Sequence, residues 1–352
     1  MLLIPVDRLL HRSAHFDSRQ DARTAIAAGR VSLGTAAAIS RNTLIDPAAV
    51  SLRVDGAPLP PPPPCTYVAL HKPINVLTTL SDDDTSERRR REGRPLPSVG
   101  ALLRAADLPS HVAPVGRLDA DSEGLLLATN DGALTHALLQ PGGPPRRYLA
   151  AVRARRSMQS SVGDVGDVAA ALCASLERGI ELSGGRRALR AERASVLDER
   201  TATERGALLF DGLLRGAEEG EEDEEEQQQL HRSAGARAGV CSHEDLLVEV
   251  TMRQGAKREV RRLLKAAGFE TLRLCRVAFG PLALRERAGE LRPLDELEVL
   301  RLYRAAFPRP GASGSAADGQ GHAGLLPVYD SERGDWVHPY ERLARLEASV
   351  GG

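Results

Sequence analysis

Apolar and polar positions along the chain follow two different spacings, one typical of strands and one typical of helices. Residues 146–152 and 272–279 alternate between the two kinds of side chain, which indicates strands with one buried face. Residues 125–129 are almost continuously apolar, which indicates a strand buried on both faces. Residues 256–267 have helical spacing and end at Gly268, a residue that commonly terminates helices. The pattern therefore predicts a chain that mixes strands and helices.

The same patterns predict further elements, namely strands at 67–73 and 246–250 and helices at 133–139 and 167–179. Residues 1–57 form a first small unit. The sequence that begins at Ser18 resembles a capping box and predicts a helix through Ala28. Short strands at 30–34 and 52–56 follow this helix. We expect the first unit to fold around a helix pair and a small hairpin.

Composition divides the chain into segments. Residues 58–65 are rich in proline and are expected to form a semi-rigid linker. A second domain then spans 66–306, interrupted at 212–242 by an acidic insertion that is expected to be disordered. Residues 307–352 form a flexible extension, in which 309–324 is the linker and the last thirty residues are able to dock a short helix.

Net charge suggests a polyanionic partner once the insertion is set aside. The formal net charge of the 352 residues is -1, but residues 217–229 carry eight acidic residues and no basic ones. The remainder therefore has a charge of -1 + 8 = +7. Nearly all of the basic residues are arginine, which forms bidentate contacts with phosphate and stacks on bases. An RNA partner is consistent with this composition.

Other composition features exclude several classes of protein. No apolar run has the length of a membrane span, so no membrane partner is expected. The four cysteines lack the paired spacing of a zinc site or a disulfide framework, which favours a reduced, intracellular protein. The cytoplasm is the default compartment, and an organelle with its own ribosomes, a chloroplast or a mitochondrion, stays open.

The segment from Gly116 to Gly124 carries the candidate chemistry. Asp119 follows Arg117 by two positions on a glycine-flanked turn and precedes the apolar run at 125–129. An arginine beside a carboxylate favours its ionised form, which suits a nucleophile or a base. A calcium loop and a metal-dependent phosphatase site also use aspartates at this spacing. The calcium loop lacks its bidentate glutamate at position twelve, and the phosphatase lacks a fitting second acidic motif and lysine.

The pattern G-R-L-D-x-D-S-x-G-L-L-L resembles the central motif of the RsuA family of pseudouridine synthases, which isomerise uridines in ribosomal RNA. Two later segments also resemble that family: R-E-V-R-R-L-L at 258–264, and L-R-L-x-R-V-x-x-G-P-L at 272–282. Glu259 departs from the family's glutamine, and His71 departs from its L-N-K-P segment. Residues 18–31 resemble an alpha-L RNA-binding domain.

The resemblance implies an α+β fold, with a small N-terminal alpha-L domain linked to a catalytic domain. It implies that this catalytic domain is built on a mixed, mainly antiparallel β-sheet with flanking helices. It assigns the catalytic role to Asp119, acting on the ribose of a flipped-out uridine either as a nucleophile or as a base. It implies that Arg261 pairs with Asp119, that Tyr148 stacks on the base and relays its proton, and that neither a cofactor nor a metal is needed.

The resemblance also implies an RNA surface and a partner. The partner is ribosomal RNA or a pre-ribosomal particle, and the protein is expected to act as a monomer. The arginines and the lysine expected to contact RNA are Arg19, Arg23, Arg30, Lys72, Arg117, Arg258 and Arg262. A non-catalytic RNA-binding protein is the main alternative, and the presence of Asp119, Tyr148 and Arg261 disfavours it.

Overall fold

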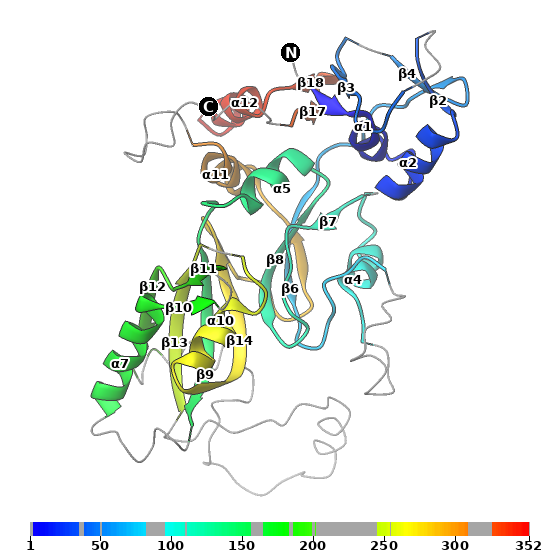
Figure 1. The fold of residues 1–352 in the computed structure, drawn as a ribbon. Helices are drawn as coiled ribbons and strands as arrows, with labels where there is room; N and C mark the ends of the chain where they lie inside the picture. The colour runs from blue at the N-terminus through cyan, green and yellow to red at the C-terminus, as the bar shows by residue number, and fades with distance from the viewer. Residues whose placement is uncertain are drawn as a thin grey trace, which may run out of the picture. The chain divides into compact units, whose positions relative to one another are not determined.

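The structure is a computed structural model of the 352-residue chain. It describes residues 3–34, 39–49, 51–81, 96–109, 111–155, 165–182, 186–198, 201, 245–253, 255–308 and 326–351. The expected acidic insertion at 212–242 and the expected linker at 309–324 lie outside the described residues. The chain forms two compact units (Figure 1). The second unit contains 121–123 and 145–279, and the first contains the remainder.

The N-terminal part of the first unit has the expected helix pair and small sheet. Its elements are β1 (Ile4–Pro5), α1 (Val6–Arg12), α2 (Arg19–Ala27), β2 (Val31–Leu33), β3 (Leu44–Ile45), β4 (Leu52–Val54) and β5 (Ala57–Pro58). Ser18 caps α2, because its side chain accepts a hydrogen bond from the backbone N–H of Asp21. Strands β2, β4 and β5 form an antiparallel sheet, and β1 pairs with β3.

The first unit also holds an antiparallel sheet in the order β8 (Glu123–Thr129), β6 (Tyr67–Lys72) and β16 (Leu291–Pro293). The short strand β7 (Ala113–Pro114) pairs with β8. All seven residues of β8 are buried, as its apolar run predicts. The other elements here are α4 (Val99–Ala105), α5 (Gly132–Leu139), β15 (Leu282–Ala283) and α11 (Glu296–Ala306).

The second unit is built on a sheet in the order β12 (Arg193–Val196), β13 (Asp245–Met252), β9 (Arg146–Ala154) and β14 (Phe269–Phe279). These neighbours pair antiparallel. Helix α7 (Val165–Arg178) packs on β12, and α10 (Glu259–Ala266) packs on β14 (Figure 1). A separate hairpin joins β10 (Ile180–Leu182) to β11 (Arg186–Leu189). The mixed, mainly antiparallel α+β fold expected from the resemblance is confirmed.

Helix α10 begins three residues later than the sequence pattern predicts. The expected helix starts at residue 256, whereas α10 starts at Glu259 and its N-cap is Arg258. Arg258 has a φ of 53°, in the left-handed region that a right-handed helix cannot contain. Apolar spacing alone does not reveal such a backbone reversal. The left-handed backbone at Arg258 directs its side chain differently from the side chain of a residue inside the helix.

The described part of the C-terminal extension is not a flexible tail. Strands β17 (Val328–Asp330) and β18 (Asp335–Val337) pair, and α12 (Pro339–Gly351) packs on α11. Trp336 of β18 joins the apolar core of the N-terminal part, where the guanidinium of Arg12 lies 5.8 Å from its ring centroid. Residues on both sides of the proline-rich segment at 58–65 belong to the first unit, and the extension packs against the N-terminal part.

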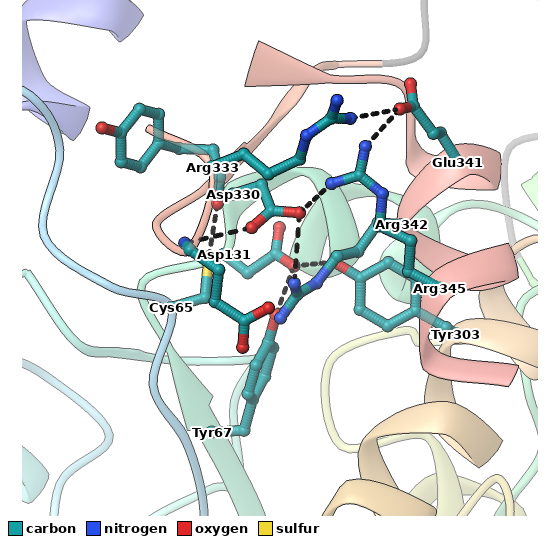
Figure 2. A network of polar contacts seen from close by, with 11 residues as sticks. Cys65, Tyr67, Asp131, Tyr303, Asp330, Arg333, Glu341, Arg342 and Arg345 are labelled. Carbon is teal, nitrogen blue, oxygen red and sulfur yellow. Dashed lines mark hydrogen bonds and ion pairs between the residues drawn. The ribbon is translucent and has the colours of Figure 1, made fainter. Parts of the chain in front are cut away.

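Buried polar groups join β17 to α12 within this extension, and they join Asp131 to Tyr67 and Tyr303 in the rest of the first unit (Figure 2). The carboxylate of Asp330 is almost fully buried and pairs with Arg345, and it lies 3.6 Å from Arg342. The hydroxyl groups of Tyr303 and Tyr67 donate to one oxygen of Asp131, at 2.5 and 3.0 Å. Each buried acid therefore has a partner that offsets its desolvation.

We expect the variant Trp336→Ala to destabilise the protein by about 3 kcal/mol, because it removes a large buried side chain from the N-terminal core. The variant Trp336→Phe, which keeps an aromatic ring, should lower the free energy of unfolding by a smaller amount. Urea denaturation of the full chain measures both values. A Trp336→Ala protein as stable as the wild type would contradict the role of this extension in holding the N-terminal part.

No helix within the described ranges is both long enough and apolar enough to cross a membrane.

Candidate active site

The turn that carries Asp119 is fixed on both of its flanks within the first unit. The hydroxyl of Thr78 donates to the carbonyl of Leu118 at 2.7 Å and accepts from the N–H of Leu118 at 3.2 Å. The carbonyl of Ala120 accepts from the N–H of Asn75 at 2.7 Å. Asp119 itself is half-buried, and its carboxylate has no hydrogen bond or ion pair with the described residues of its unit. The backbone is held while the carboxylate stays available.

Glycines allow this turn at both of its ends. Gly116 has a φ of 76° and Gly124 a φ of 105°, a region that residues with a Cβ rarely adopt. A Cβ added to Gly116 would also lie 3.1 Å from the side chain of Leu139. The glycines of the motif therefore set the course of the backbone that presents Asp119.

Three arginines of the second unit hold the next part of the motif, residues Asp121 to Glu123. Arg258 donates to both carboxylate oxygens of Asp121, at 2.9 and 2.8 Å. Arg261 donates to the backbone carbonyl of Asp121 at 2.5 Å, and its Nε lies 3.7 Å from the carboxylate of Asp121. Arg273 donates to both oxygens of Glu123, each at 2.7 Å. This arginine clamp, Arg258, Arg261 and Arg273, fixes the segment that begins two residues after Asp119.

The arginine clamp also bears on the two metal-binding interpretations of the motif. Both require free carboxylate oxygens at Asp121 or Glu123. In the structure, both carboxylates already form bidentate ion pairs with arginine, and Glu123 is 3% exposed. Such pairing suits a fixed turn rather than a cation site.

The three residues expected to act in catalysis belong to two different units. Asp119 belongs to the first unit, whereas Tyr148 and Arg261 belong to the second. The pairing of Arg261 with Asp119 therefore stays a prediction. What the structure gives Arg261 are contacts with Asp121 and with the carbonyl of Thr271 at 3.4 Å.

Tyr148 lies in a charged and aromatic cluster of the second unit. It sits on β9 directly opposite Arg276 of β14, and the two side chains form a hydrogen bond. The guanidinium groups of Arg276 and Arg146 lie 5.3 and 5.1 Å from the ring centroid of Phe279. Tyr148 is only 8% exposed. The cluster gives the tyrosine a fixed orientation in an apolar, positively charged setting.

Glu259 is the acidic member of this cluster and stands where the resembling family has glutamine. It is 5% exposed, and its carboxylate accepts a hydrogen bond from the N–H of Ala256 at 3.0 Å. Burial raises the pKa of Glu259 to about 7, although the Ala256 hydrogen bond and the charges of Arg146 and Arg276 act in the opposite direction. The site therefore contains a carboxyl group that titrates near neutrality.

We expect Glu259→Gln to stabilise the protein above neutral pH. The raised pKa means that native Glu259 keeps a proton that the unfolded chain releases, so stability falls as the pH rises from about 4.5 to about 7. Glutamine removes the cost of ionising a buried carboxyl group, and its side-chain oxygen can still accept the hydrogen bond from the N–H of Ala256. At pH 8 the gain should be on the order of 1–3 kcal/mol, and below pH 4.5 it should vanish. Urea denaturation at both pH values measures it, and a loss at pH 8 would contradict the burial argument.

The N-terminal arginines expected to contact RNA all have acidic partners in the structure. Arg19 and Arg23 both bind the buried carboxylate of Asp7, at 2.7 and 2.8 Å. Arg30 pairs with Asp55 at 2.6 Å on the surface. These three side chains are 36% to 50% exposed, so their outer N–H groups still face solvent. Their contact with RNA stays a prediction.

The other expected RNA contacts divide into two groups. Arg117, Arg258 and Arg262 are exposed and fit the expectation. Lys72 does not, because it is 0% exposed and its ammonium group donates to the carbonyls of Pro73 and Val76, at 2.8 and 2.9 Å. A fully buried ammonium group in a turn of the chain is not presented to a phosphate. We therefore leave Lys72 out of the RNA surface.

Sequence reasoning missed several residues that position the site, three through their side chains and Asn75 through its backbone N–H. Thr78, Asn75, Arg273 and Arg276 were not singled out, although Arg273 and Arg276 lie within a motif that was recognised. The alternation of β14 could have indicated that Arg276 interrupts an otherwise buried face. No pattern in the sequence indicates that Thr78 binds Leu118, because forty residues separate them.

Comparison with known proteins gives consistent matches. The family model described as RNA pseudouridylate synthase matches residues 66–266. An uncharacterized RNA pseudouridine synthase of Mycobacterium tuberculosis is 32% identical over 291 residues, which cover 82% of this chain and 89% of the relative. Ribosomal large subunit pseudouridine synthase B of Bacillus subtilis is 26% identical over 242 residues, covering 68% of this chain and 72% of that protein.

Among solved structures, a crystal structure of a pseudouridylate synthase has a TM-score of 0.44 and 20% identity, and it covers 85% of this chain and 99% of that chain.

Proposed function

The chain belongs to the RNA pseudouridine synthase family, an isomerase family acting on uridine in RNA, and from this premise we propose that it modifies ribosomal RNA through Asp119. The ribosomal target is supported by the Bacillus subtilis relative, whose name specifies the large ribosomal subunit. The single observation that supports the role of Asp119 is its placement. Its backbone is held before it by Thr78 and after it by Asn75, and the arginine clamp holds residues 121–123, while its carboxylate stays available.

The reaction breaks the bond from N1 of uracil to C1′ of the ribose and forms a bond from C5 to the same carbon. The proton on C5 leaves and N1 gains one, so the reaction has no net gain or loss of atoms or electrons. Asp119 acts on the ribose, as a nucleophile at C1′ or as a base at C2′. An ionised carboxylate on a fixed turn suits both roles, because it needs little reorganisation to reach the sugar.

Tyr148 acts on the base. Its ring stacks on uracil, and its hydroxyl takes or relays the C5 proton. The hydrogen bond with Arg276 orients this hydroxyl, and the neighbouring guanidinium groups favour negative charge that develops on the base during the reaction. Tyr148 is largely buried, so a uridine that reaches it must leave its stack, at a cost of a few kcal/mol.

RNA binding is assigned to exposed arginines. Arg117 stands beside the catalytic turn, and Arg258 and Arg262 flank the start of α10. The N-terminal part is proposed to be an alpha-L RNA-binding domain, with Arg19, Arg23 and Arg30 facing phosphates through the N–H groups that their acidic partners leave free. The protein acts as a monomer on ribosomal RNA or a pre-ribosomal particle, in the cytoplasm or in an organelle with its own ribosomes.

The test is a map of pseudouridine in ribosomal RNA from cells that lack this protein, complemented either with the wild type or with Asp119→Ala. We expect one site to be restored by the wild type and not by the variant, which would establish the substrate and the catalytic residue together. Restoration by both proteins would refute the role of Asp119. Dependence of no ribosomal site on the protein would refute the target.

A further inference from the structure

A pocket of about 380 Å³ lies within the first unit between α1, β7 and α5. It contains none of the catalytic residues proposed above, and one of its lining residues, Arg19, is among the arginines expected to contact RNA. Six of its lining residues are basic or titratable to a cation, namely Arg8, His11, Arg12, Arg19, His111 and His136. None of its lining residues is acidic. The walls therefore combine three permanent positive charges with three imidazole rings.

The nearest acidic groups have other partners. Asp7 is shared between Arg19 and Arg23, so it offsets only part of the charge of Arg19. One oxygen of Asp131 accepts from two backbone N–H groups at the start of α5, each at 3.0 Å, and the other accepts from Tyr303 and Tyr67. The positive charge of the pocket is thus incompletely balanced by the protein.

The histidines respond to this charge. Burial, together with the charges of His111, Arg19 and Arg12, lowers the pKa of His11 to about 4. Burial and the charges of Arg8 and Arg12 also lower the pKa of His136. Burial first, and the neighbouring positive charges second, therefore favour the neutral form of both rings at pH 7. An anion bound there would raise both pKa values and allow the rings to donate hydrogen bonds to it.

Two of the arginines that line the pocket have N–H groups without a hydrogen-bond partner among the described residues. Arg12 donates through Nη1 to the carbonyl of Pro327 at 2.6 Å, while its buried Nη2 has no hydrogen-bond partner among the described residues. Nε of Arg19 is likewise buried without a described partner. Buried N–H groups usually bind an acceptor, so these two side chains keep unused hydrogen-bonding capacity next to the pocket that they line.

We propose that this pocket binds a phosphate group, either of an RNA backbone or of a free nucleotide. Planar guanidinium groups match the geometry of phosphate oxygens, and three arginines with adjacent imidazoles form the kind of site that a divalent oxyanion prefers. The volume lies in the range of sites for nucleotide-sized ligands. The RNA arm of the proposal rests on the proposed function, whereas the free-phosphate arm does not.

The test follows the imidazole signals of the full-length protein by ¹H–¹⁵N NMR during two titrations. One uses inorganic pyrophosphate, and the other uses a short single-stranded oligoribonucleotide without uridine, so that catalysis does not enter. We expect saturable shifts at His11, His111 and His136, and a raised pKa for His11, while His71 and His338 stay unchanged. The double variant Arg8→Gln, His136→Gln should weaken binding about tenfold or more, because each lost charged hydrogen bond contributes on that scale.

Arg41→Gln is the matched control, since Arg41 is an exposed arginine of the same N-terminal part outside the pocket. Shifts with pyrophosphate alone would identify a free phosphate ligand, and shifts with the oligonucleotide alone would identify an RNA contact. Shifts with neither probe, or shifts that persist in the double variant, would overturn the site. Pseudouridine formation is not the readout, so this failure is separate from failure of the proposed function.

Discussion

Replacing Asp119 with asparagine is expected to lower the rate of pseudouridine formation by about 10⁴-fold or more, the scale on which loss of a reacting group acts in other enzymes. Asparagine has nearly the same shape but carries no charge and is a poor nucleophile and base. A single-turnover assay with a ribosomal RNA substrate measures the loss. It reports the chemical step directly, without interference from product release.

The same variant should leave stability almost unchanged. The carboxylate of Asp119 has no hydrogen bond or ion pair with the described residues of its unit, so its loss removes no contact there. The turn itself is held by the backbone bonds with Thr78 and Asn75. A change in the free energy of unfolding within about 0.5 kcal/mol is expected. An inactive variant that is also strongly destabilised would assign Asp119 a structural role instead.

The second largest effect is expected at Arg261. The variant Arg261→Ala removes the hydrogen bond with the carbonyl of Asp121 and the charge beside its carboxylate. Because Asp121 stands two residues after Asp119, the catalytic carboxylate should lose its fixed position. A displacement of about 1 Å can cost about 10²-fold in rate, and we expect a fall of that size in kcat.

Arg261→Lys separates position from charge. Lysine keeps the charge but has no planar fork, so it should restore only part of kcat. Arg258→Gln serves as a comparison, because it breaks the bidentate pair with the carboxylate of Asp121 and leaves the carbonyl contact in place. Its loss in kcat should be smaller. If Arg261→Ala raised KM and left kcat unchanged, Arg261 would bind RNA rather than position Asp119.

The motifs of the sequence located the parts of the site that are close together along the chain. Asp119, Asp121 and Glu123 lie in one short segment, and Arg258 and Arg261 lie in another, so each group can be recognised as a sequence motif. The motifs did not indicate which arginine contacts which acidic residue. The resemblance implied that Arg261 pairs with Asp119, whereas in the structure Arg261 contacts Asp121. The ion pair between Arg273 and Glu123 completes the arginine clamp.

The sequence by itself determined many of the elements. Alternation identified strands β9 and β14, a continuous apolar run identified β8, and helical patterns identified α5 and α7, because each pattern depends only on neighbours along the chain. Ser18 likewise marked the start of α2, since a capping hydrogen bond spans only three residues. Local physical chemistry is sufficient wherever the interacting groups are close in sequence.

The tertiary structure alone decided how polar and aromatic side chains are used. In the structure, Lys72 is buried and Asp7 forms ion pairs with Arg19 and Arg23. Trp336 packs in the core of the N-terminal part. A lysine, an aspartate and a tryptophan each suit both a surface and an interior, depending on which partners the fold brings near. Burial and ion pairing depend on groups that can lie hundreds of residues apart, and no local pattern of the chain carries that information.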